Sequence, residues 1–163
     1  MQNAKDTFYT TLRNRLAALN PNRVMILRGI QRPGILVEDA EVPMAQMPAD
    51  VFVLRWTALA IDTQLPSALA QLRCEIHYAT GGTQSNSGLD RGRTLEEMDA
   101  ELLAILNPPA SQKMNYVQTT GPTAMGTRIF WSTPVFEAAV TSRERLTRIA
   151  TIDVFAFQEQ GEL

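Results

Sequence analysis

Few side chains in this sequence have the chemistry of a catalytic centre. His77 is the single histidine and Cys74 the single cysteine. They lie three residues apart in an alternating segment, so a strand would direct their side chains to opposite faces. This separation disfavours a Cys–His nucleophile pair, and no serine stands in the sequence context of a nucleophile elbow. We expect His77 to be a surface or interface residue and the protein not to be an enzyme.

The carboxylates form two groups, and neither is typical of a metal or glycosidase site. Such sites need carboxylates that converge from a rigid frame. One group, at 38–41, stands in a segment interrupted twice by proline. The other consists of Glu96, Glu97, Asp99 and Glu101 and fills the first turns of an expected helix, where negative charge complements the helix dipole. We predict neither a metal site nor a cofactor.

The segment from Gly81 to Gly92 is rich in Gly, Ser, Asn and Thr and predicts a loop with little reason to order itself. It is not a phosphate-binding loop of the form G-x-x-x-x-G-K-[ST], because it contains no lysine. Arg91 and Arg93, beside the start of the next helix, keep one alternative open: an anion pocket in a small ligand-binding domain or enzyme. Solvated or interface arginines are the favoured interpretation.

The composition is that of an ordinary soluble domain. The chain has 163 residues, of which 45% are hydrophobic and 20% charged. A net charge of -2 and a pI of about 5.4 give no basic field for nucleic acid. A single cysteine excludes an internal disulfide and suits a reducing compartment. No signal peptide and no apolar run of about 20 residues are evident, so we expect a cytoplasmic product outside the membrane.

Hydrophobic periodicity predicts the first elements. An amphipathic helix is expected over residues 3–19, with Phe8, Leu12 and Leu16 on one face. A short strand is expected at 23–29, followed by a turn at 31–34 (QRPG). The run at 51–61 (VFVLRWTALAI) is apolar on both faces and predicts a strand covered on both sides. A turn at Pro66 should return it antiparallel to the next strand.

The second half of the chain begins with a strand that alternates apolar Leu72, Cys74, Ile76 and Tyr78 with polar residues. Thr94 and Glu97 predict a capping box for a helix at 94–106. The buried stripe of this helix is expected to be Leu95, Met98, Leu102 and Ile105, packed against Leu72, Cys74 and Ile76. Further strands are expected at 127–136, broken by Pro134, and at 143–158.

These elements predict one α+β domain, with a mostly antiparallel sheet and two main helices on one face. Three segments should protrude: 38–50, 79–93 and 107–126. Long arms and two-sided apolar strands favour assembly over a monomeric globule. Expected contact residues are Arg91, Arg93, Glu96, Glu97, Phe155 and Phe157. The arginines should pair with Glu96, Glu97 or the 38–41 carboxylates of a neighbouring subunit.

The order of elements resembles the tail terminator, or tail-completion, proteins of tailed bacteriophages. The resemblance covers nearly the whole chain and is carried mainly by residues 71–106, with their Arg-Gly-Arg-Thr helix entry, and by the closing strand near 146–157. It implies a small α+β subunit of a hexameric ring that caps the finished tail tube and docks to the head or neck. It also implies assembly in the host cytoplasm into a virion, with DNA passing through the lumen and no catalytic residues. Neck or head–tail connector proteins share this size and ring symmetry and are the alternative.

Overall fold

The first helix, α1 (Gln2–Leu19), is the centre of the main core. The computed structural model describes residues 1–41, 47–64, 66–117, 120–159 and 162. Phe8, Leu12 and Leu16 recur every fourth residue and are fully buried, because they share one face of the helix. Leu19, at the end of α1, is half exposed. The predicted helix is confirmed.

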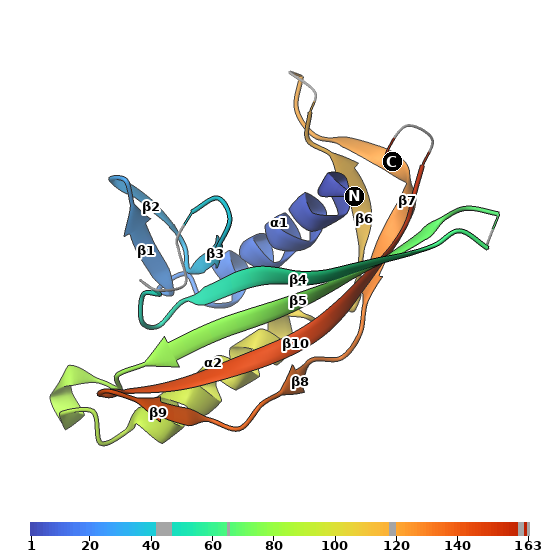
Figure 1. The fold of residues 1–163 in the computed structure, drawn as a ribbon. Helices are drawn as coiled ribbons and strands as arrows, with labels where there is room; N and C mark the ends of the chain where they lie inside the picture. Colours follow the sequence, from blue (N-terminus) through green and yellow to red (C-terminus); the bar gives the residue numbers. More distant parts are fainter. Residues whose placement is uncertain (42–46, 65, 118–119, 160–161, 163) are drawn as a thin grey trace.

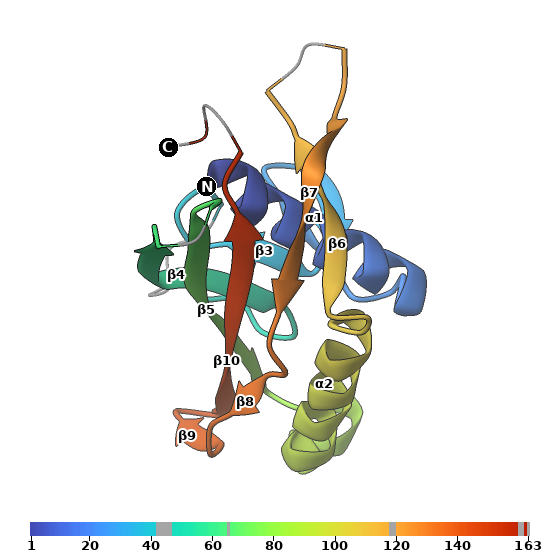
Figure 2. The same cartoon turned by 90° about the vertical axis from the view of Figure 1, so that its right-hand side faces the viewer.

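Most of the strands form one curled sheet in the order β3-β4-β5-β10-β7-β6, and two short strands, β8 and β9, pair with β10 beside this path (Figures 1 and 2). Neighbouring strands are antiparallel, except that β3 and β4 are parallel. The predicted α+β class with a mostly antiparallel sheet is therefore confirmed. The bounds are β3 (Ile35–Val37), β4 (Phe52–Asp62), β5 (Leu69–Thr80), β6 (Ala110–Asn115), β7 (Thr123–Trp131), β8 (Val135–Phe136), β9 (Val140–Ser142) and β10 (Arg145–Phe157).

Both helices cover the same face of the sheet. The second helix, α2 (Arg91–Ile105), lies behind β10 in Figure 1, whereas α1 lies beside β4 in that view and contacts α2 and β6. The predicted α2 stripe of Leu95, Met98, Leu102 and Ile105 is buried in one cluster with alternate residues of β5 and β10. Ala150, Ile152, Val154 and Ala156 of β10 are fully buried on this face. The opposite face of the sheet, here called the open face, is turned toward the viewer in Figure 1.

The expectation that 51–61 is covered on both sides holds only for its first residues. Phe52 and Leu54 are buried in the main core, and Val51 and Val53 in a second cluster with Leu36. Most of β4 from residue 55 onward is exposed. The reason is that β3 pairs with β4 only at 52–54, so the rest of β4 extends beyond its cover.

The first hairpin corrects the predicted turn at 31–34. These residues belong largely to β2 (Ile30–Pro33), which pairs antiparallel with β1 (Val24–Leu27) in a separate two-stranded sheet. The chain turns instead at Arg28 and Gly29, both with positive φ (51° and 80°), as a two-residue hairpin turn requires. Pro33 is tolerated in β2 because an edge strand does not need every N–H.

Two of the three predicted protruding segments are partly regular structure. Segment 107–126 contains β6 and the start of β7, which form an antiparallel hairpin. Segment 79–93 begins in β5, passes a 3₁₀ turn at Gln84–Asn86 and ends in α2. Of segment 38–50, residues 42–46 lie outside the described part. The predicted break at Pro134 is confirmed, since it separates β7 from β8.

Candidate assembly surfaces

Three phenylalanines gather on the open face near the end of β10. Phe155 pairs across strands with Phe130 of β7, and Phe157 pairs with Leu69 of β5. Phe155 and Phe157 are half-buried, and Phe130 is 45% exposed. Phe130, Phe155 and Phe157 are here called the phenylalanine surface. Apolar area left open to water in this way favours a partner.

The phenylalanine surface has a shallow hollow at its edge. The hollow measures about 460 Å³ and is lined by Pro66, Ser67, Thr127 and Phe157. Asp62 of β4 pairs with Leu69, which pairs with Phe157, so these three residues form one row across the open face. The row therefore has an aromatic ring at one end and an exposed carboxylate at the other.

The four predicted charged contact residues lie at the opposite end of the sheet. Arg93, Glu96 and Glu97 are exposed on the first turns of α2, and Arg91 is partly buried. These turns follow the end of β5, whereas the phenylalanine surface lies beside its start. The strand β5 has twelve residues, and at a rise of about 3.3 Å per residue its two ends, beside which the two groups lie, are roughly 36 Å apart. The six predicted residues thus form two surfaces.

The start of α2 differs from the predicted capping box. The helix begins at Arg91, three residues before Thr94. Thr94 lies inside the first turn, where its hydroxyl donates to the carbonyl oxygen of Asp90 at 3.1 Å instead of capping the helix. The sequence predicted a later start for this helix because Gly92 is a poor helix former.

Asp90 orders the loop that the composition predicted to be loose. Its carboxylate accepts hydrogen bonds from the Thr83 backbone N–H (2.9 Å), the Thr83 hydroxyl (2.6 Å) and the Asn86 amide (3.1 Å). These hydrogen bonds lower the pKa of Asp90 to about 2, and the one from the Thr83 hydroxyl has the largest effect. The loop is therefore a folded feature of the isolated subunit, contrary to the expectation.

The Arg91 side chain packs against this loop. A Cβ at Gly88 would lie 2.9 Å from Arg91 Nε, and Gly88 also has a φ of +75°, so glycine is required there. Within the described part of the chain, the buried Nε of Arg91 has no acceptor.

Two of the 38–41 carboxylates, proposed as partners for these arginines, are already engaged within the subunit. Glu38 forms an ion pair with Arg55 at 3.2 Å. Glu41 pairs with Arg32 and accepts hydrogen bonds from the Tyr9 hydroxyl and the Val37 N–H. Only Asp39 of this group is exposed. Glu38 and Glu41 therefore have internal roles, and the predicted pairing of Arg91 or Arg93 with them loses its basis.

The β1–β2 hairpin is a further apolar surface that sequence reasoning missed. Met25 and Leu27 pack against the second cluster, formed by Leu36, Val51 and Val53. The outward side chains of Ile26 and Val24 are exposed by 70% and 38%, and Ile30, which pairs with Leu27 at the end of the inner side, is exposed by 59%. We call this hairpin, residues 24–33, the arm. Its apolar run was correctly predicted as a strand, but a lone run carries no signal of which side remains uncovered.

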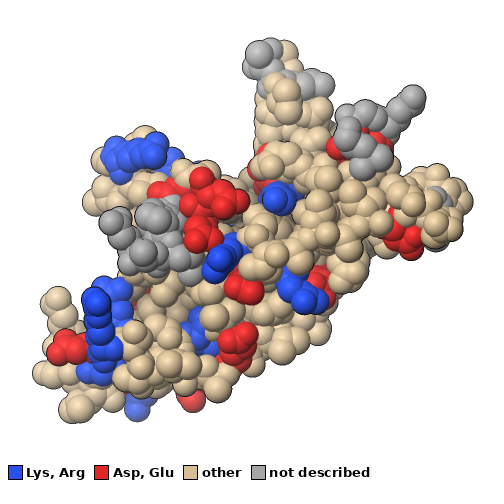
Figure 3. All heavy atoms as spheres, viewed as in Figure 1, with Lys and Arg blue, Asp and Glu red and all other residues tan. Residues whose placement is uncertain are grey.

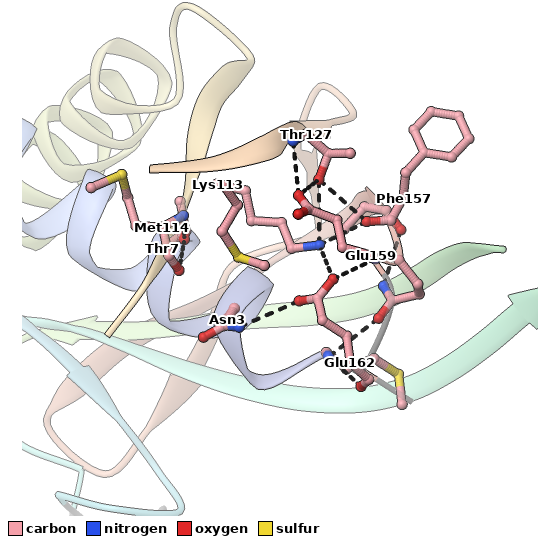
Figure 4. A network of polar contacts seen from close by, with 12 residues as sticks. Asn3, Thr7, Lys113, Met114, Thr127, Phe157, Glu159 and Glu162 are labelled. Carbon is pink, nitrogen blue, oxygen red and sulfur yellow. Dashed lines mark hydrogen bonds and ion pairs between the residues drawn. The ribbon is translucent and has the colours of Figure 1, made fainter. Parts of the chain in front are cut away.

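A buried lysine holds the end of the chain against the body (Figure 4). Lys113 of β6 is fully buried, where it forms an ion pair with Glu162 and donates to the Phe157 carbonyl oxygen at 2.7 Å. Glu159 accepts from the backbone N–H (2.8 Å) and hydroxyl (2.7 Å) of Thr127. We call Lys113, Thr127, Glu159 and Glu162 the clasp. Its polar groups are bonded to one another, so the clasp joins the residues after β10 to β6 and β7.

The residues with catalytic potential do not converge. Cys74 is fully buried on the helix-covered face, and this burial raises the pKa of its thiol. His77 lies on the other face, with Nε2 2.9 Å from a carboxylate oxygen of Glu75. The described residues contain no cluster of His, Cys, Asp and Glu suited to a metal ion. No helix in this part of the chain is long and apolar enough to cross a membrane.

Comparison with known proteins leaves these surfaces as the main guide to function. No known protein family and no curated protein sequence matches this chain.

Proposed function

We propose that this protein is a non-enzymatic structural subunit that assembles with copies of itself into a closed ring. The observation that carries the proposal is a pair of different exposed apolar surfaces on one subunit. The arm projects at one end of the sheet, and the phenylalanine surface lies toward the other end (Figure 1). Two unlike surfaces favour head-to-tail contacts, which close into a ring when the rotation between copies permits.

The role of the ring is to end a phage tail tube and to offer a docking surface to the head or neck. This part of the proposal rests on the resemblance in the order of elements, which also implies six copies. The observed succession of α1, the arm, the long β4–β5 hairpin, α2 and the closing strand β10 is compatible with it. The β6–β7 hairpin (Figure 2) and the β4–β5 hairpin (Figure 1) are candidate contacts for the tube.

Electron microscopy of the purified protein, mixed with tail tubes assembled from the tube protein of the same genome, tests this role. We expect one ring at one end of each tube. Rings that ignore tube ends but bind the portal side of the capsid vertex would instead identify a neck or connector protein. A protein that forms no rings, with or without tubes, contradicts the proposal altogether.

A further inference from the structure

The arm is packed against the rest of the protein on one side only. A two-stranded hairpin has little stability of its own in water. The arm packs Met25 and Leu27 of its inner side on the second cluster and exposes Val24 and Ile26 on the outside. Burying such side chains is favourable in proportion to the area removed from water. A partner that covers this side would therefore fix the arm in place.

The phenylalanine surface has the matching properties. It offers aromatic side chains and a shallow hollow next to Phe157, whose lining is mostly apolar. A branched aliphatic side chain presented by a hairpin suits such a hollow, because it fills the space without bringing a polar group that needs a partner. Of the outer arm residues, Ile26 is the most exposed and is the natural candidate.

Charge at the two surfaces is complementary. Arg28, at the turn of the arm, is exposed, and no ion pair involves it among the described residues. Asp62, in the row with Phe157, is also exposed and accepts one hydrogen bond, from the Gln64 N–H at 2.9 Å. Figure 3 shows basic side chains on the arm and acidic side chains near the β4–β5 hairpin. Opposite charges at the two ends align a head-to-tail contact and disfavour the reverse orientation.

We infer that the arm of one copy binds the phenylalanine surface of the next, with Ile26 in the hollow beside Phe157 and Arg28 against Asp62. This inference rests on the proposed ring, and it identifies the contact that would build it. Within one subunit the two surfaces lie at different ends of the sheet, so a second copy is required (Figure 1). Because each copy uses both surfaces once, the contact repeats around the ring and leaves none unpaired.

Charge reversal tests the pairing of Arg28 with Asp62. Arg28→Glu and Asp62→Arg should each weaken self-association by about two- to tenfold at low salt, since an exposed pair contributes modestly and reversal makes it repulsive. The double variant should restore association to nearly the wild-type value, because the two residues interact directly. The control is Arg143→Glu, an exposed charge of the same sign in the turn between β9 and β10, outside both surfaces. Sedimentation velocity over a range of concentrations provides the measurement.

A cysteine pair tests the position of the arm. Ile26→Cys combined with Ser67→Cys should give disulfide-linked oligomers under mild oxidation, whereas Ile26→Cys with Ser85→Cys should not. The native Cys74 is fully buried and does not compete. Oligomers that form normally, without this cross-link and without a response to charge reversal, overturn the inference and leave the ring intact. A protein that stays monomeric at every concentration overturns both the inference and the proposed function.

Discussion

Lys113 is a buried charged residue whose contacts join separate parts of the chain. Its ammonium group has no exposed surface, and its carboxylate partner Glu162 is only 7% exposed. Taking two charges out of water is costly. The buried pair is tolerated because neighbouring groups form further hydrogen bonds with both of its members. The contacts join β6 to Phe157, the last residue of β10, and to Glu162, which follows it. At the residue scale, the clasp is the feature whose loss should be most easily measured.

Lys113→Met should destabilise the subunit by about 3–5 kcal/mol, since it leaves a carboxylate buried without its partner. Methionine keeps most of the side-chain volume, so the loss reports the charge and its hydrogen bonds. The matched control, Arg93→Met, removes an exposed cation and should change the free energy of unfolding by no more than about 0.5 kcal/mol. Urea unfolding measures both. Equal, small effects for the two variants would show that the clasp contributes nothing.

The clasp should also make stability depend on pH. Burial raises the pKa of Glu162, but the hydrogen bonds from Lys113 and the Glu159 N–H outweigh it, and the net shift is downward. Its contribution is therefore complete above the ordinary value of 4.5 and is lost as pH falls through the lowered value. Glu162→Gln should reduce the fall in Tm between pH 5 and pH 3. Glu96→Gln, at an exposed position, should leave this fall unchanged.

Asp90 provides the corresponding test for the loop at 81–90. Asp90→Asn replaces an acceptor of three hydrogen bonds by an amide that cannot accept them all. We expect faster protease cleavage in the loop and faster hydrogen exchange of the Thr83 N–H at pH 7. In the wild-type protein the same change should appear only as pH falls from the ordinary pKa of 3.8 toward about 2. A loop equally protected in both proteins contradicts the role of Asp90.

At the scale of elements, local patterns predicted the two helices and the long strands but missed β2 and β6, and they did not reveal what surrounds each element. The alternation of Leu72, Cys74 and Ile76 predicted their common face, because the pleat directs alternate side chains to the same side. No local pattern could reveal the clasp, since Lys113 meets residues 44 and 49 positions later. The same holds for Leu59 and Ile61, whose apolarity predicted burial although β4 extends past its cover.

The candidate contacts were predictable in the same partial way. Alternation along the strand expected at 143–158 puts Phe155 and Phe157 on one face, opposite Val154 and Ala156, and the structure has this face turned away from the helices. It could not supply Phe130, because only the register of β7 with β10 brings that residue beside Phe155. The arm was missed for a similar reason: its exposure depends on which side the second cluster covers.

The packing of α2 yields a test with an adjacent control. Leu102 is fully buried in the main core, whereas Leu103 is 49% exposed. Leu102→Ala should lower the free energy of unfolding by about 2–5 kcal/mol through loss of burial and creation of a cavity. Leu103→Ala should cost much less, since alanine favours the helix and little area is lost. Similar losses for the two variants, measured by urea unfolding, would mean that α2 is rotated from the orientation described.

At the scale of the whole molecule, the subunit combines a complete core with incomplete surfaces. One face of the sheet is covered by both helices, while the open face is covered near the arm and exposed around the phenylalanines. A monomer gains nothing from an exposed arm at one end and an aromatic surface toward the other. A closed ring uses both surfaces in every copy, and we expect the protein to form one.

Native mass spectrometry of the purified full-length chain tests that claim most directly. We expect one dominant closed oligomer, which has six copies if the resemblance holds for stoichiometry, in equilibrium with monomer on dilution. Intermediates should be few, because closing the ring adds a contact that open chains lack. Ile26→Asp should convert this oligomer to monomer without changing the far-UV circular dichroism, since Ile26 is 70% exposed in the subunit. A strict monomer at all accessible concentrations, or an open-ended ladder of oligomers, would contradict it.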